Sequence, residues 1–220
     1  MHLDTSRHAP QSLAAGGGGP LRLCTVDGGT FPAATGRWWE PSSEEDQLVL
    51  TRVVAPVLDI GCGPGRHVVA LSERGVDAFG LEMDPRLVDV ARRRGADVLQ
   101  GSVFDPLAFV RPWRSVLLLD GNLGIGGDPV RLLARVRSLL GRCGRVLAEL
   151  DPPGTPAELA DVRLELAGTV GPFFRLARVP VDVVEVTAHR SGFDVADCWQ
   201  SGSRYFTELV ARASAIAPTA

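Results

Sequence analysis

The chain has 220 residues, of which 45% are hydrophobic, and a formal net charge of −3. This length and composition predict one globular domain with room for a modest additional element. The acidic balance provides no broad basic surface for nucleic acid, and no apolar run reaches the ~18 residues of a membrane span. The chain contains arginine but no lysine, which excludes Schiff-base chemistry and a phosphate loop that needs lysine.

Strands and helices are expected to alternate from about residue 55 onward. The predicted strands are 56–62, 77–84, 96–101, 114–122, 144–151, 193–200 and 204–211, and the predicted helices are 66–74, 85–94, 130–140 and 181–192. Residues 162–168 are a candidate for a further strand. Asp84-Pro85 and Asp128-Pro129 each combine an N-cap residue with a proline at the first helical position.

This alternation predicts an α/β fold with a doubly wound, mostly parallel, seven-stranded sheet. Helices are expected on both faces, and the last two strands form an antiparallel hairpin. In such sheets a ligand binds at the carboxyl ends of the strands. The loops 61–66, 82–85, 101–105 and 120–128 are therefore the expected site.

The stretch "LDIGCGPGR" (58–66) joins the first of these strands to its helix through a glycine-rich turn. A dinucleotide loop of the form G-x-G-x-x-G would need its last glycine where Arg66 stands. The glycines still allow close approach of a ligand to the backbone. The pattern therefore disfavours a dinucleotide and leaves open a loop built for a ligand without phosphate.

Five segments in chain order resemble those of class I S-adenosylmethionine-dependent methyltransferases, over roughly residues 37–154. They are "VLDIGCGPG" (57–65), "VDAFGLEMDP" (76–85), "ADVLQGSVFDPL" (96–107), "SVLLLDGN" (115–122) and "LLGRCGRVLAELDPPG" (139–154). The resemblance implies S-adenosyl-L-methionine as cofactor and S-adenosyl-L-homocysteine as product. It also implies an N-terminal cap or lid at 21–54 and a Rossmann-like methyltransferase domain at 55–220, while the Gly/Pro-rich composition of residues 1–20 predicts a disordered leader.

The resemblance assigns the glycine loop to the methionine part of the cofactor and Glu82 to both ribose hydroxyls. Where the family often has Asp after the third strand, this chain has Ser102, so either Ser102 or Asp105 contacts the adenine amino group. Trp38 or Trp39 is expected in the lid, with Arg37 near the cofactor carboxylate. The expected cofactor-binding residues are Arg37, Trp38, Asp59, Gly61, Cys62, Gly63, Gly65, Glu82, Met83, Ser102, Val103, Asp120 and Gly121.

The catalytic candidates are Asp120, Asn122 and His67. Methyl transfer from a sulfonium depends mainly on proximity and orientation, so a base is required only if the acceptor loses a proton in the step. Asn122 could orient the acceptor, and His67 could act as a base if it faced the acceptor. Segment 152–178, with Phe173, Phe174 and Arg175, is the expected substrate wall.

We therefore expect a methyltransferase that acts on a small molecule by O-, N- or C-methylation, including acceptors of secondary metabolism. "DPPG" (151–154) resembles the motif of adenine-N6 DNA methyltransferases, but it follows the wrong strand and lacks the stacking aromatic residue. The open alternatives are a non-methylating or non-catalytic S-adenosylmethionine-binding protein and an NAD(P)-dependent oxidoreductase.

The expected partners are limited to a small-molecule methyl acceptor, with no nucleic acid and no membrane. The expected assembly is a monomer or homodimer. The four scattered cysteines lack metal-ligand spacing, and the N-terminus lacks the pattern of a secretory signal. We therefore expect no metal site and a cytoplasmic location.

Overall fold

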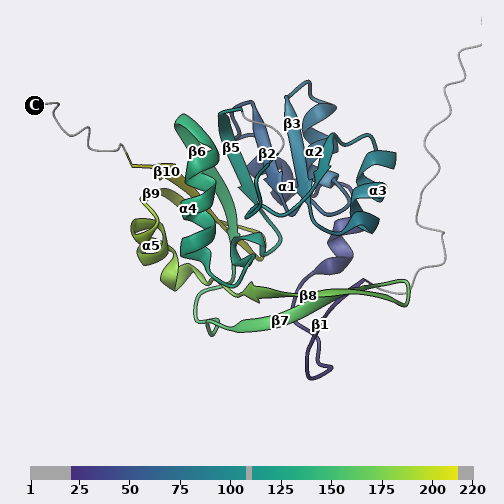
Figure 1. Ribbon diagram of the computed structural model, residues 1–220. Coiled ribbons are helices and arrows are strands. Elements are labelled where there is room, and N and C mark those ends of the chain that lie inside the picture. The colour runs from purple at the N-terminus through teal and green to yellow at the C-terminus, as the bar shows by residue number, and fades with distance from the viewer. Residues whose placement is uncertain (1–20, 108–110, 213–220) are drawn as a thin grey trace, which may run out of the picture.

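The computed structural model describes residues 21–107 and 111–212, and the expected leader at 1–20 lies outside this part of the chain. The main sheet has seven strands in the order β4-β3-β2-β5-β6-β10-β9 (Figure 1). Their bounds are β2 Val57–Ile60, β3 Ala78–Glu82, β4 Val98–Gln100, β5 Trp113–Leu118, β6 Leu140–Leu150, β9 Phe193–Ser201 and β10 Arg204–Ala211. Strands β2 to β6 pair in parallel, whereas β10 is antiparallel to both β6 and β9. The predicted fold class is confirmed.

The α-helices are α1 Glu44–Leu50, α2 Arg66–Ser72, α3 Pro85–Arg93, α4 Pro129–Leu139 and α5 Val181–Arg190, with short 3₁₀ helices η1 Thr35–Trp39 and η2 Asn122–Gly124. Three of these five α-helices, α1, α3 and α4, begin after a residue whose side chain caps them. The Asp84 and Asp128 side chains accept N–H groups of the first turns of α3 and α4. Both predicted cap-plus-proline starts are thus confirmed. None of the helices within residues 21–107 and 111–212 has the length and hydropathy needed to cross a bilayer.

Alternate residues of the central strands supply two separate cores, one on each face of the main sheet. In β5, Val116 and Leu118 pack with the helices α4 and α5, and Leu117 packs with α1, α2 and α3. All three side chains are fully buried. Because both faces of β5 are covered, its second half, Val116 to Leu118, is continuously apolar, as expected for a central parallel strand.

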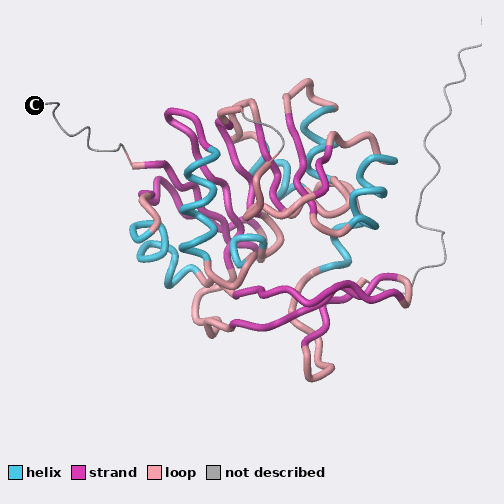
Figure 2. Tube along the Cα trace, in the orientation of Figure 1, coloured by secondary structure: helices cyan, strands magenta, loops and turns pink. Residues whose placement is uncertain are grey.

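A second sheet, of three antiparallel strands, lies across one end of the main sheet (Figures 1 and 2). Its order is β1-β7-β8, with bounds Arg22–Thr25, Leu159–Leu166 and Thr169–Ala177. The turn between β7 and β8 has positive φ at Ala167 and Gly168, +51° and +74°, as a two-residue hairpin turn requires. This sheet covers the edge at which the parallel strands end.

The three-stranded sheet was only partly predicted. The expected strand at 162–168 corresponds to β7, whereas β1 and β8 fall in segments expected to be a lid and a substrate wall. Gly171 and Pro172 interrupt the strand pattern of β8, and β1 has only four residues. Such short or interrupted strands are identified by their pairing partners rather than by their own pattern.

Candidate functional site

The glycine-rich turn after β2 needs backbone conformations that favour glycine. Gly61, Gly63 and Gly65 have φ values of +71°, +54° and +80°. A Cβ on Gly65 would lie 2.9 Å from Ala96 Cβ and 3.0 Å from Ala91 Cβ. Gly65 therefore allows the start of α2 to pack closely against α3 and the chain that follows it.

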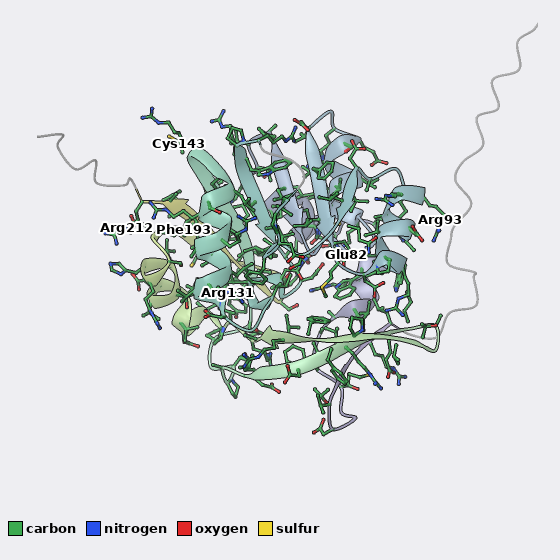
Figure 3. All side chains as sticks on the ribbon, in the orientation of Figure 1. Glu82, Arg93, Arg131, Cys143, Phe193 and Arg212 are labelled. Carbon is green, nitrogen blue, oxygen red and sulfur yellow. The ribbon has the colours of Figure 1, made fainter. Side chains whose placement is uncertain are left out.

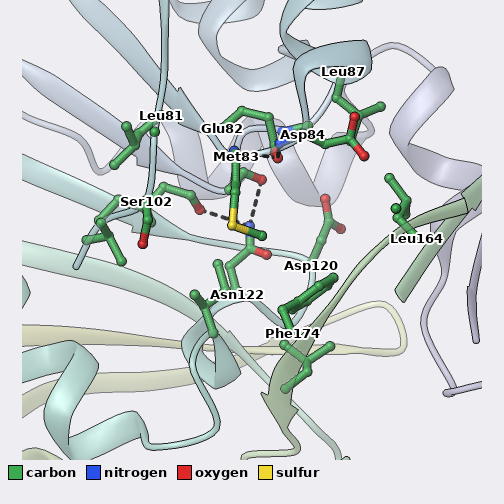
Figure 4. Close-up of a pocket in the computed structure, with 18 of the residues that line it drawn as sticks. Leu81, Glu82, Met83, Asp84, Leu87, Ser102, Asp120, Asn122, Leu164 and Phe174 are labelled. Carbon is green, nitrogen blue, oxygen red and sulfur yellow. Dashed lines mark hydrogen bonds between the residues drawn. The ribbon is translucent and has the colours of Figure 1, made fainter. Parts of the chain in front are cut away.

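Asn122 holds this turn in place from the end of the neighbouring strand. Its Nδ2 donates hydrogen bonds to the carbonyl oxygens of Ile60 and Gly61, at 3.0 and 2.9 Å. A Cβ on Gly61 would lie within 2.9 Å of the Asn122 amide. Asn122 thus contacts the glycine loop directly, and its side chain also faces the pocket described below (Figure 4).

Glu82, the last residue of β3, has its carboxylate fixed by three backbone N–H groups. Oε2 accepts from Gly63 at 2.9 Å, and Oε1 accepts from Met83 at 2.7 Å and from Asp84 at 2.8 Å. Burial raises the pKa of Glu82, and the same N–H donors oppose that rise. The carboxylate is therefore oriented before any ligand binds, and it lines the pocket (Figures 3 and 4).

A pocket of about 170 Å³ lies between the carboxyl edge of the main sheet and the three-stranded sheet. The predicted residues that line it are Trp38, Gly61, Gly63, Glu82, Met83, Ser102, Val103, Asp120, Asn122 and Phe174. The opposite wall was not predicted in detail; it includes Leu23, Ile125, Leu164, Pro172 and Leu176. The lining is therefore mostly apolar, with its charged and amide side chains on the wall formed by the main sheet, an arrangement typical of small-molecule sites.

A much smaller polar pocket, of about 10 Å³, adjoins the first beneath the glycine loop. Cys62, Arg66, His67 and Asp120 line it together with Trp38. A cavity of this volume is just large enough to hold one water molecule. The predicted residues Cys62 and His67 thus reach this smaller pocket but not the larger one.

Asp120 lies at the centre of a buried ionic cluster. The cluster joins four acidic and four basic side chains: Asp46, Asp59, Asp120, Glu149, Arg37, Arg66, His67 and Arg204. Asp120 Oδ2 lies 2.8 Å from Arg66 Nη2, and Oδ1 lies 3.0 Å from Arg37 Nη2. Burial opposes ionisation of Asp120, but the charges of His67 and Arg66 outweigh it, so its pKa is lowered. Asp120 is therefore an anion facing both pockets.

His67 is buried between two carboxylates. Its Nε2 lies 3.5 Å from Asp46 Oδ1, and its Nδ1 lies 3.5 Å from Asp59 Oδ2. Burial acts to lower the pKa of His67, but the two carboxylates outweigh it and raise the pKa to about 9. A protonated imidazole has no lone pair to accept a proton, so this geometry disfavours the expected role of His67 as a base.

Several expected site residues lie behind the pocket surface. Asp59 is buried beside His67, and Arg37 reaches Asp120 and Glu149 without lining either pocket. Gly65 and Gly121 also lie outside the pocket linings, with Gly121 at the start of η2. Of these four residues, Arg37 and Asp59 contact side chains that do face a pocket, Asp120 and His67.

The sequence indicated three pairs of candidate residues, and in each pair one residue lines the larger pocket and the other does not. Ser102 lines the pocket, whereas Asp105 does not, and the backbone carbonyl of Asp105 accepts a hydrogen bond from Arg135. Phe174 lines the pocket, whereas Phe173 is 46% exposed on the other side of β8. Trp38 lines both pockets, and Trp39 lines neither.

Comparisons with known proteins agree with this geometry. A methyltransferase domain family model matches residues 57–144. Among curated proteins, magnesium-protoporphyrin O-methyltransferase of Rhodobacter capsulatus is 40% identical over 47 residues, 21% of each chain. Ubiquinone biosynthesis O-methyltransferase of Xylella fastidiosa is 31% identical over 80 residues, 30% of this chain and 32% of that protein. The aligned segments thus span between a fifth and a third of these two relatives.

The solved structures extend the likeness to most of the chain. A SAM-dependent methyltransferase from Bacteroides fragilis, in complex with S-adenosyl-L-homocysteine, superposes with a TM-score of 0.73 over 88% of both chains at 21% identity. An identity this low supports the fold, and the family model supports the domain. Residues 57–144 therefore match a methyltransferase domain model, and the chain has the fold of the solved S-adenosylmethionine-dependent methyltransferase.

Proposed function

We propose that this protein transfers the methyl group of S-adenosyl-L-methionine to a small-molecule acceptor. The observation that carries the proposal is the pre-oriented carboxylate of Glu82, which faces the same pocket as the glycine loop. A carboxylate held in this way accepts hydrogen bonds from two vicinal hydroxyls, and the glycine loop allows a ligand to approach the backbone. The donor set thus fits a nucleoside joined to an amino acid.

The cofactor, when bound, supplies an electrophilic methyl group. In the proposed arrangement Glu82 binds the ribose hydroxyls, Ser102 and Val103 lie along the adenine, and Gly61 and Gly63 lie against the methionine part. Asp120 provides a negative charge near the cofactor ammonium, and Arg37, 3.0 Å from Asp120, is the proposed partner of the cofactor carboxylate. Residues 21–54 act as the cap, a role supported by Leu23 and Trp38 in the pocket lining.

The acceptor is proposed to react without a strong base from the protein. The charged side chains that line the larger pocket are Glu82, Asp84 and Asp120. Hydrogen bonds and charges from Arg86 and Arg66 help to keep the pKa values of Asp84 and Asp120 below their ordinary range despite burial. Weak bases of this kind leave proximity and orientation as the main contribution to the rate. Asn122 and the apolar wall would orient the acceptor.

Calorimetric titration tests the cofactor assignment. We expect S-adenosyl-L-homocysteine to bind with one site per chain and NADH to produce no binding heat. Binding of NADH without binding of S-adenosyl-L-homocysteine would instead support an NAD(P)-dependent oxidoreductase.

Turnover separates catalysis from simple cofactor binding. The protein is incubated with S-adenosyl-L-methionine and a panel of phenols, amines and carbon acids, and formation of S-adenosyl-L-homocysteine is measured by mass spectrometry. Acceptor-dependent product formation is expected for a methyltransferase. Tight cofactor binding without product across the panel would favour the non-catalytic alternative.

The proposal places the protein in the cytoplasm, as a monomer or homodimer, and includes no nucleic-acid or membrane partner.

A further inference from the structure

Two sets of hydrogen bonds attach the three-stranded sheet to the rest of the molecule, in addition to the apolar core that it shares with Leu87 of α3. At one end, Ile125 forms a β-bridge with Leu176, and the Gly126 N–H donates to the Arg175 carbonyl at 3.0 Å. At the other end, near the β7–β8 turn, Arg86 of α3 reaches the hairpin backbone. Its Nη1 donates to the Thr169 carbonyl at 2.8 Å, and its Nη2 lies 3.4 Å from the Leu164 carbonyl.

Arg86 is held in this position by the residue that caps its own helix. Its Nε lies 2.9 Å from Asp84 Oδ1, and its Nη2 lies 2.5 Å from Asp84 Oδ2. This two-point contact is the geometry in which arginine and carboxylate bind most strongly. The Asp84 N–H in turn donates to Glu82 Oε1 at 2.8 Å. A short series of contacts thus connects the pocket carboxylate to the hairpin.

The hairpin held by Arg86 forms part of the pocket wall. Leu164 and Phe174 line the pocket on the side opposite Glu82 (Figure 4), and Gly171 also lines it. Arg86 itself does not line the pocket. Its contacts therefore hold the wall in place without contributing a surface to the ligand.

We propose that Arg86 is a positioning residue that latches the β7–β8 hairpin over the cofactor pocket, and that opening of this latch limits cofactor exchange. The inference rests on the proposed function, because it takes the pocket to be the cofactor site. The latch acts through backbone carbonyls, so it depends on the position of the hairpin rather than on the side chains of β7 and β8.

The latch has a distinctive kinetic consequence. Arg86 stabilises the closed hairpin by the same contacts with and without cofactor, because it does not touch the pocket. Weakening the latch therefore raises the population of the open form by the same factor in the free protein and in the cofactor-bound protein. Entry and release of the cofactor accelerate together, and the dissociation constant stays nearly constant.

The experiment measures association and dissociation rates of S-adenosyl-L-homocysteine by stopped-flow fluorescence or surface plasmon resonance. For Arg86→Ala we expect both rates to rise about tenfold, the loss typical of a charge-assisted contact, and the dissociation constant to change less than threefold. Arg86→Lys retains the charge but not the two-point geometry, so intermediate rates are expected. Arg93→Ala is the matched control, because Arg93 is exposed on the outer side of the same helix (Figure 3).

Hydrogen exchange supplies a second readout that needs no ligand. Amides of residues 159–177 should exchange faster in Arg86→Ala than in Arg93→Ala, while circular dichroism shows both variants folded. Equal exchange or equal binding rates in the two variants would overturn the latch. An increase in the dissociation rate alone, with a matching loss of affinity, would also overturn it, since Arg86 would then act on bound cofactor through Glu82. Failure of the wild-type protein to bind would remove the proposed function and the latch with it.

Discussion

At the scale of single residues, the site depends on side chains whose charges are held by specific neighbours. Glu82 receives three backbone N–H groups, whereas Asp120 faces three arginine side chains. A backbone donor orients a carboxylate without neutralising it, whereas an arginine compensates its charge. Glu82 is therefore the better acceptor for new hydrogen bonds from a ligand.

Replacing Glu82 by Gln should weaken binding of S-adenosyl-L-homocysteine by roughly 10- to 100-fold, because hydrogen bonds to a charged group contribute about 1.5–3 kcal/mol. Calorimetric titration measures the change. Glu73→Gln is the control, since Glu73 is exposed just after α2. Equal affinity of the two variants would mean that Glu82 does not contact the cofactor.

His67 should make the free energy of unfolding depend on pH. Because the pKa of its folded form is about 9, above the ordinary value of 6.5, its stabilising charge is fully present below about pH 6.5 and is lost as pH rises through 9. Urea denaturation between pH 6 and 10 should show a loss on the order of 3 kcal/mol. His67→Gln should remove most of this dependence and exposed His189→Gln should retain it. An unchanged slope in His67→Gln would contradict the charged assignment.

At the scale of elements, η2 and β8 approach more closely than any side chain would allow. A Cβ built on Gly124 would lie 1.9 Å from the Ala177 carbonyl oxygen. The same two elements carry Asn122, which holds the glycine loop, and Phe174, which lines the opposite wall. Their close contact thus sets the spacing between the two walls of the pocket.

Gly124→Ala should therefore move β8 away from η2, lower the free energy of unfolding by about 1–3 kcal/mol, and weaken binding of S-adenosyl-L-homocysteine. Gly36→Ala is a matched control, because Gly36 lies in η1 and an added Cβ there meets nothing within 4 Å. Denaturation and calorimetric titration provide the two measurements. A Gly124 variant with the stability and affinity of the Gly36 variant would contradict this account of the spacing.

At the scale of the whole molecule, the buried ionic cluster connects distant parts of the chain. Asp46 of α1 contacts Arg66 at the start of α2, and its Oδ1 lies 2.6 Å from Arg204 Nη1 in β10. Burial opposes its ionisation, but contacts with His67, Arg66 and Arg204 keep the pKa of Asp46 far below its ordinary value. The N-terminal segment, the glycine loop and the C-terminal hairpin are thus joined through one carboxylate.

Asp46→Asn should lower the free energy of unfolding by about 3–5 kcal/mol, because removing one partner leaves buried arginine charges uncompensated. Urea denaturation measures the loss, with exposed Asp89→Asn of α3 as control. A loss below about 1 kcal/mol, the range typical of a surface ion pair, would mean that water reaches the cluster and screens it.

Local patterns were sufficient for the helices and strands of the main sheet and for the position of the site at its carboxyl edge. Capping residues, apolar periodicity and positive-φ glycines each act within a few residues, so they can be identified along the chain. The start of β6 was wrong by four residues: the strand begins at Leu140 instead of at 144, because its first glycines do not resemble a strand. The glycine loop was identified from its own residues, whereas Glu82 was identified from the resemblance of its segment to a known family.

The rest of the site depends on contacts between residues far apart in the sequence. Leu23 of β1 pairs with Leu164 of β7, and Asp46 forms an ion pair with Arg204, which lies far from it in the sequence. Arg66 was identified only as the residue that replaces a glycine, whereas the folded chain buries it against Asp46 and Asp120. Pairing partners and burial determine which charges are compensated, and both exist only once the chain has folded.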